Sequence, residues 1–223
     1  MFRCDRAQLV EAIMLEGNRQ FQGLNDLFGD CFGSLVSEVI IVDPYIKTAI
    51  QQNGLLMMLG LIRDKWANSP PVPLKITLIT NNDLDMEVTN FHAHENDIRE
   101  DSYGGIFEHI FTLHDRNLVK FKVVEIRWVH DRSISLLTKM DETYTVFQVK
   151  LGKGLDITFC RCGCRYPRGA SHQDVLQIDP NNLRTRMCEI TKLHWQFTEL
   201  VNATKFFSAL LTYYKSGIIR PFY

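Results

Sequence analysis

The stretch VSEVIIVDPYIK, residues 36–47, joins a run of β-branched apolar residues to an abrupt polar end. A short continuous apolar run of this kind predicts a strand that is buried on both faces. Pro44 has no backbone N–H for a sheet ladder, so the strand is expected to end near Val42. Asp43 then lies at the carboxyl end of a buried strand, where open α/β sheets collect their functional side chains.

Alternating helices and strands extend outward from this stretch. Apolar residues at helical spacing over residues 48–66 predict a helix, and LKITLIT at residues 74–80 predicts a second buried strand. A helix over residues 95–113 and a strand over residues 119–129 continue the alternation. This order predicts right-handed crossovers and an α/β fold, with a mainly parallel sheet and flanking helices.

The second half of the chain predicts more strands and a last helix. SISLLT at residues 133–138 and YTVFQVKL at residues 144–151 predict a hairpin, and residues 187–197 predict a further strand. The last helix is predicted from one shared face, which is formed by Leu200, Ala203, Phe207, Leu210 and Tyr214.

Composition limits the possible partners only loosely. The chain has 223 residues with 25 basic and 26 acidic side chains, a formal net charge of −1. This balance gives no overall attraction to nucleic acid or to an anionic membrane, so any anion site has to be a local patch. No apolar stretch of about 18 residues is present, and we expect no transmembrane helix. The six cysteines are not regularly spaced, which predicts reduced thiols and a cytoplasmic protein.

The tripeptide His-Asp-Arg occurs twice, at residues 114–116 and 130–132. The first copy follows a predicted helix, and a charged surface position at the helix end explains it. The second copy ends a predicted buried strand, so His130 is expected at the rim of the sheet, as a binding or catalytic histidine would be. A structural alternative stays open, in which His130 and Arg132 fix the hairpin by hydrogen bonds, with Asp43 as a partner.

Three segments in this order resemble one protein family. SEVIIVDPYIK at residues 37–47, VHDRSI at residues 129–134 and VKLGKGLD at residues 149–156 are similar to the C-terminal phospholipase D-like domain of MIT (microtubule-interacting and trafficking) proteins. The resemblance implies a phospholipase D-like α/β domain over residues 21–198. It also implies a module of membrane remodelling that is usually dimeric, binds lipid and is generally not catalytic.

The segments that flank this domain are predicted to be helical. Residues 1–20 mix acids into an apolar pattern, as an amphipathic helix does and a signal peptide does not. The three-helix MIT module does not fit into this length, so ESCRT proteins are not expected as partners. Residues 199–223 are predicted to form a C-terminal helical extension, which is also a candidate for protein contact.

The motifs favour phosphate binding over catalysis. Catalytic members of the superfamily combine histidine, lysine and a supporting acid, whereas here Arg132 takes the place of the lysine and Leu137 that of the acid. Losing groups that act together costs orders of magnitude in rate, but phosphate binding requires fewer parts. The predicted phosphate- or lipid-binding residues are Arg132, Lys150, Lys153, Gly152 and Gly154. We therefore expect a non-catalytic homodimer that binds anionic membrane lipids, such as phosphoinositides, as a peripheral membrane protein.

Two alternatives remain open. In a symmetric dimer, two His130 side chains can meet and form the catalytic site of a phosphodiesterase or nuclease, with Asp131 or Asp156 as the acid. Nucleic acid is a possible partner under this alternative. The fold can instead serve as a scaffold for protein interaction. The residues predicted to support the site are Asp43, Tyr45, Asp131 and Asp156.

No cofactor or metal ion is predicted. Cys160, Cys162 and Cys164 alternate along the chain, and Cys188 or His172 is a candidate fourth ligand. Structural zinc sites usually take closely spaced ligand pairs from two sides, which this spacing does not match. Because cysteine also packs as a small apolar residue, a zinc site is the weaker alternative.

Overall fold

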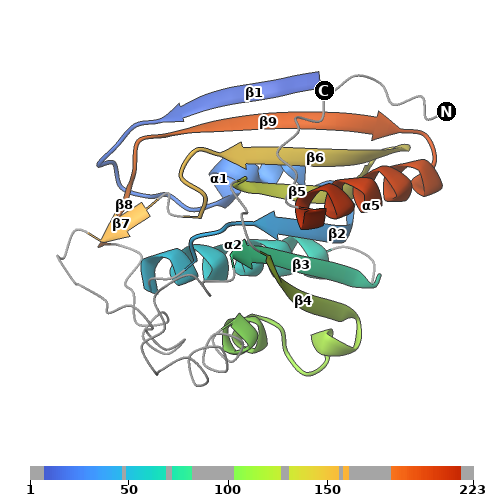
Figure 1. Ribbon diagram of the computed structural model, residues 1–223, viewed down its shortest axis with the longest axis horizontal. Coiled ribbons are helices and arrows are strands. Elements are labelled where there is room, and N and C mark those ends of the chain that lie inside the picture. Colours follow the sequence, from blue (N-terminus) through green and yellow to red (C-terminus); the bar gives the residue numbers. More distant parts are fainter. Residues whose placement is uncertain are drawn as a thin grey trace.

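The computed structural model describes residues 8–46, 49–68, 72–81, 103–126, 131–155, 158–160 and 182–216. Within them, a seven-stranded sheet has the order β1-β9-β6-β5-β2-β3-β4 (Figure 1). Its strands are β1 (Gln8–Leu15), β2 (Leu35–Val42), β3 (Leu74–Asn81), β4 (Val119–Ile126), β5 (Ser133–Met140), β6 (Thr143–Leu151) and β9 (Cys188–Phe197). A small second sheet pairs β7 (Thr158–Cys160) with β8 (Leu183–Thr185). The helical elements are α1 (Asn25–Phe28), η1 (Gly29–Cys31), α2 (Ala49–Ala67), residues 103–110, η2 (Asp115–Asn117) and α5 (Leu200–Ser216).

The first three predicted strands form the parallel part of the sheet. β2 pairs with β3, and β3 pairs with β4, both in parallel register. α2 makes the connection between β2 and β3, since parallel neighbours require a crossover rather than a tight turn. The predicted α/β fold with flanking helices is confirmed.

The rest of the sheet corrects the expectation of a mainly parallel arrangement. β5 lies antiparallel to β2 and to β6, and β9 lies antiparallel to β6 and to β1. The short turn between β5 and β6 permits only an antiparallel neighbour, and the later strands continue that pattern. The sheet is therefore mixed, with its parallel pairs confined to one side.

The N-terminal segment forms a strand where the sequence predicts a helix. Gln8–Leu15 are β1, an edge strand that pairs with β9 and has a register shift between Leu9 and Glu11. The helix prediction for residues 1–20 is wrong over this stretch. Its apolar residues suit a bulged strand as well as a helix, and the open edge of β9, far away in the sequence, decides between the two.

Helices cover both faces of the sheet (Figure 1). α1, α2 and residues 103–110 contribute to the larger core cluster on one face. α5 covers the opposite face, where Ala203, Phe207, Leu210 and Tyr214 pack against apolar residues of β2, β5, β6 and β9. The predicted packing face of this helix is confirmed except at Leu200, which is 47% exposed. None of the helices in the described part of the chain combines the length and apolarity needed to span a bilayer.

The first His-Asp-Arg copy closes the helical segment that precedes β4. Asp115 Oδ2 accepts hydrogen bonds from Thr112 N at 2.9 Å and from Thr112 Oγ1 at 2.8 Å. Arg116 Nε donates to the carbonyl of Phe111 at 3.1 Å, while His114 is exposed. These local bonds confirm the interpretation of this copy as a helix-end feature.

Candidate functional site

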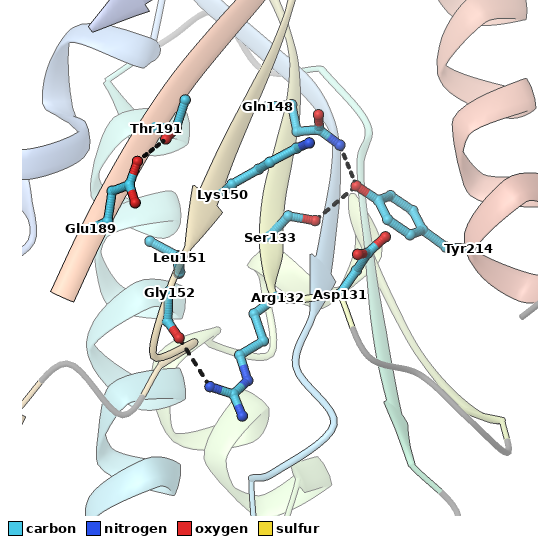
Figure 2. A pocket seen from close by; sticks show the side chains of 10 residues that line it. All are labelled: Asp131, Arg132, Ser133, Gln148, Lys150, Leu151, Gly152, Glu189, Thr191 and Tyr214. Atoms are coloured by element: carbon cyan, nitrogen blue, oxygen red, sulfur yellow. Dashed lines mark hydrogen bonds between the residues drawn. The ribbon is translucent and has the colours of Figure 1, made fainter. Parts of the chain in front are cut away.

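A cavity of about 370 Å³ opens at the end of the sheet at which the inner strand β2 finishes (Figure 2). The strand register builds its wall, because Ser133 of β5 pairs with Lys150 of β6, which in turn pairs with Thr191 of β9. Residues paired across neighbouring strands project from the same face. Tyr214 of α5 faces this row of side chains from the other side and completes the lining.

Charges of both signs line the cavity. Arg132 and Lys150 are the cations, and Asp131 and Glu189 are the anions. Among the residues that the structure describes, no ion pair joins any two of these four groups. The two cations are therefore not neutralised by direct contact with the carboxylates beside them.

The Arg132 guanidinium is held from two sides. Its Nη1 donates to the carbonyl oxygen of Gly152 at 3.1 Å, and its central carbon lies 4.5 Å from the centroid of the Tyr45 ring. The backbone of this residue is also fixed, because its carbonyl accepts the Leu151 N–H at 2.9 Å. A hydrogen bond and a cation–π contact together restrict the rotamers of the arginine, which is one of the residues that line the cavity.

Asp43 anchors the turn of residues 152–155. It is 3% exposed at the end of β2, and its two carboxylate oxygens accept the Tyr45 N–H at 3.0 Å and the Leu155 N–H at 2.5 Å. Gly154 in this turn has a φ of 62°, and a Cβ on it would overlap Asp43 Oδ2. Only glycine satisfies both conditions. The acid at the end of β2 thus positions the Gly-Lys-Gly segment beside Arg132.

Tyr214 brings a buried hydroxyl to the cavity. Its oxygen lies 2.7 Å from Ser133 Oγ and accepts a hydrogen bond from Gln148 Nε2 at 2.5 Å. Burial raises the pKa of the Tyr214 phenol, although its hydrogen bonds to Ser133 and Gln148 oppose that change. The phenol is therefore a neutral hydrogen-bonding group at ordinary pH.

The sequence predicts Tyr214 only as part of an apolar helix face, and it does not point to Ser133, Gln148, Glu189 or Thr191 as residues of the site. A usable signal was present in the strands. Ser133 and Gln148 are polar residues that are buried within two largely buried strands. Buried polar groups at such positions have to find partners, and here the partner comes from α5.

The structure brings together three of the five predicted phosphate-binding residues. Arg132, Lys150 and Gly152 line the cavity. Gly154 lies directly beneath the arginine, with its Cβ position 3.0 Å from Arg132 Cδ, and has a role in the turn. Lys153 is exposed and does not line the cavity.

Several predicted residues cannot be placed. His130, Asp156, Cys162, Cys164 and His172 lie outside the described residues, as does the side chain of Cys160. Cys188 is a buried free thiol whose pKa is raised by that burial. Within the described residues, no group of three or more potential metal ligands occurs.

Comparisons with known proteins agree with this fold. Residues 22–194 match the family described as the phospholipase D-like domain at the C-terminus of MIT. Curated protein sequences give no match. The matched residues take in the sheet from β2 into β9 and every lining residue of the cavity except Tyr214. The chain belongs to the family of phospholipase D-like domains found at the C-terminus of MIT proteins.

Proposed function

We propose that this domain binds a phosphate-bearing ligand in the cavity and does not cleave it. The observation that carries the proposal is the placement of Arg132 and Lys150 on the wall of one cavity, with the guanidinium held by Tyr45 and Gly152. A restrained arginine fork matches the spacing of phosphate oxygens, and a lysine adds a point charge beside it.

An anionic lipid headgroup, such as that of a phosphoinositide, is the ligand class that we propose. The cavity of about 370 Å³ falls at the low end of the roughly 300–1,000 Å³ that is usual for small-ligand sites, which suits a headgroup better than a whole lipid. Binding of this kind makes the domain a peripheral membrane module. In a homodimer, two such sites facing one membrane would bind it more tightly than either site alone, through avidity.

The residue at the position of the supporting acid favours binding without turnover. Leu137 occupies the place, five residues after Arg132, where catalytic members of the superfamily carry an acid. Its side chain is 1% exposed and packs in the core beneath α5. A supporting carboxylate at this position would have to be buried among apolar groups, where its charged form is costly.

Vesicle sedimentation tests the proposal. We expect the wild-type protein to bind phosphatidylcholine vesicles that contain a phosphoinositide and not vesicles of phosphatidylcholine alone. The double variant Arg132→Ala/Lys150→Ala should lose about tenfold or more in affinity, since it removes charge-assisted hydrogen bonds. The control Lys120→Ala/Lys122→Ala removes the same charge from exposed positions of β4 and should bind as the wild type does.

Two outcomes would overturn the proposal. Equal losses in the double variant and its control would mean that general charge, and not this cavity, drives binding. Cleavage of a phosphodiester lipid, DNA or RNA by the wild type, absent in His130→Ala, would replace the proposal with a dimeric phosphodiesterase or nuclease.

A further inference from the structure

The C-terminal helix α5 closes one side of the cavity (Figure 2), although it lies outside the residues that match the family. Ala203, Phe207 and Leu210 pack its earlier turns onto the sheet through apolar contacts. Tyr214, in the last turn, is 5% exposed and carries a polar atom into the same buried layer. The helix therefore contributes one hydrogen-bonding group where the rest of its contact face is apolar.

The hydrogen bonds of Tyr214 leave one hydroxyl proton without a fixed acceptor. Gln148 Nε2 donates to the phenol oxygen, and Ser133 Oγ lies 2.7 Å from it. A hydrogen bond holds one proton, so only one of the two hydroxyl protons of Ser133 and Tyr214 lies between their oxygens. The other proton has to point elsewhere, and both residues line the cavity.

Ser135, the neighbouring hydroxyl on β5, is fully buried and has no partner within hydrogen-bond distance among the described residues, although a weaker interaction with the phenol opposes the rise that burial causes in the pKa of Tyr214. Ser135 does not line the cavity, so a hydroxyl proton that is donated to a ligand there has to come from Ser133 or Tyr214. In Figure 2 the Asp131 carboxylate lies on the Tyr214 side of the cavity. Burial raises the pKa of Tyr214 and the charge of Asp131 adds to that rise, against the lowering effect of the hydrogen bonds. The phenol thus keeps its proton over the whole physiological range.

We infer that the Ser133–Tyr214 pair is a ligand-binding element, in which Gln148 orients the phenol and the spare hydroxyl proton is donated to an oxygen of the ligand. The inference rests on the proposed function, in which Arg132 and Lys150 hold the phosphate. A neutral donor on a separate part of the cavity wall favours an oxygen-rich phosphate ester over a simple anion. It makes α5 part of the specificity of the site.

The variant Tyr214→Phe tests the inference because it removes one hydroxyl and keeps the ring that packs against the sheet. The probe is the soluble headgroup of a phosphatidylinositol bisphosphate, measured by titration calorimetry, with inorganic phosphate as a second probe. We expect roughly a tenfold loss of headgroup affinity, the effect of one hydrogen bond to a charged acceptor. The loss for inorganic phosphate should be smaller. Tyr213→Phe, the matched change at the preceding position of α5, should leave both affinities unchanged.

The outcomes separate this inference from the proposed function. Unchanged headgroup affinity in Tyr214→Phe, with a lowered unfolding temperature, would leave the tyrosine a purely structural residue and overturn the inference. If headgroup affinity is lost in Arg132→Ala/Lys150→Ala but not in Tyr214→Phe, the proposed function still stands. A wild-type protein that binds neither probe overturns both.

A measurement on the wild-type protein covers the case in which Tyr214→Phe does not fold. Ring-carbon NMR can follow the Tyr214 signal, which its Overhauser contact with the Gln148 amide identifies, while the headgroup is added. A shift of this signal that saturates together with the shifts of the Arg132 and Gly152 backbone amides is expected. Shifts at these amides with a stationary Tyr214 signal would overturn the inference.

Discussion

Replacing Gly154 by alanine tests how the turn beside Arg132 is built. Gly154 has a φ of 62°, in the left-handed region that favours glycine. An added Cβ would overlap a carboxylate oxygen of Asp43 and lie 2.9 Å from Asp43 Cγ and 3.0 Å from Arg132 Cδ. Because Asp43 is 3% exposed and already accepts the Leu155 N–H, it has no solvent space into which to move. The methyl group therefore displaces the acid, the arginine or the turn.

The size of the effect follows from two costs. A residue with a side chain costs about 1–2 kcal/mol in the left-handed region. Loss of the Asp43–Leu155 hydrogen bond leaves a buried polar group unpaired, at a cost of about 1–3 kcal/mol. We therefore expect Gly154→Ala to lower the free energy of unfolding by about 2–5 kcal/mol. Affinity for the phosphate-bearing ligand should fall as well, since Arg132 is displaced.

Urea unfolding followed by tryptophan fluorescence measures this change. Gly60→Ala is the control, because Gly60 lies inside α2 and its Cβ would meet, among the described residues, only Ile110 Cδ1, at 3.9 Å. That substitution should stabilise the protein by up to about 1 kcal/mol, since alanine favours the helix over glycine. If Gly154→Ala stays within about 0.5 kcal/mol of the wild type, the turn relaxes freely and the anchoring role of Asp43 is refuted.

Three further substitutions or treatments probe other parts of the fold. Gly54→Ala in α2 places a Cβ that overlaps the Leu155 carbonyl oxygen. Urea unfolding should therefore show a loss of about 1–3 kcal/mol in the free energy of unfolding. A free energy equal to that of the wild type would contradict this close approach. Burial alone would lower the pKa of Lys192, but its hydrogen bonds to two carboxylates raise it above the ordinary 10.5. Its ammonium therefore stabilises the fold below pH 10.5, and this contribution is lost as the pH rises through the folded-state pKa. The difference in Tm between wild type and Lys192→Met should shrink in that range, and a constant difference would count against the ion pair. Burial, with help from a neighbouring carboxylate, raises the pKa of the Cys31 thiol to about 12. Peptide mass spectrometry should thus find Cys31 alkylated only after denaturation, and rapid native labelling would show that the site opens.

The parts of the fold that the sequence predicts are those with a strong local pattern. The apolar run before Asp43, the hairpin of residues 133–151 and the apolar face of α5 each specify their own structure. β1 was missed because its short amphipathic pattern suits two conformations, and the partner that selects the strand is distant in sequence. The antiparallel pairings of β5 with β2 and of β9 with β6 and β1 were missed for the same reason, since strand direction depends on which neighbours meet.

The residues of the candidate site also differ in whether the local sequence predicts them. Arg132, Lys150 and Gly152 lie in short motifs near one hairpin, so the sequence alone was enough to group them. Glu189 and Tyr214 reach the cavity only through the register of β9 and the docking of α5. A tyrosine on an apolar helix face predicts packing, and nothing local indicates which polar groups its hydroxyl will meet.

Under the proposed function, the charge balance of the cavity requires donors that are held in place before a ligand binds. Asp131 and Glu189 offset Arg132 and Lys150, so the site exerts little net attraction on a distant anion, and salt screens what remains beyond the Debye length of about 10 Å in 0.1 M salt. Recognition then has to come from contacts at hydrogen-bonding distance, where each donor faces its own acceptor. Such contacts give the most binding free energy when the donors are already in place, because ordering a side chain on binding costs free energy. The Tyr45 contact of the guanidinium, the turn anchored by Asp43 and the ordered Tyr214 hydroxyl each fix a donor or its support before a ligand arrives.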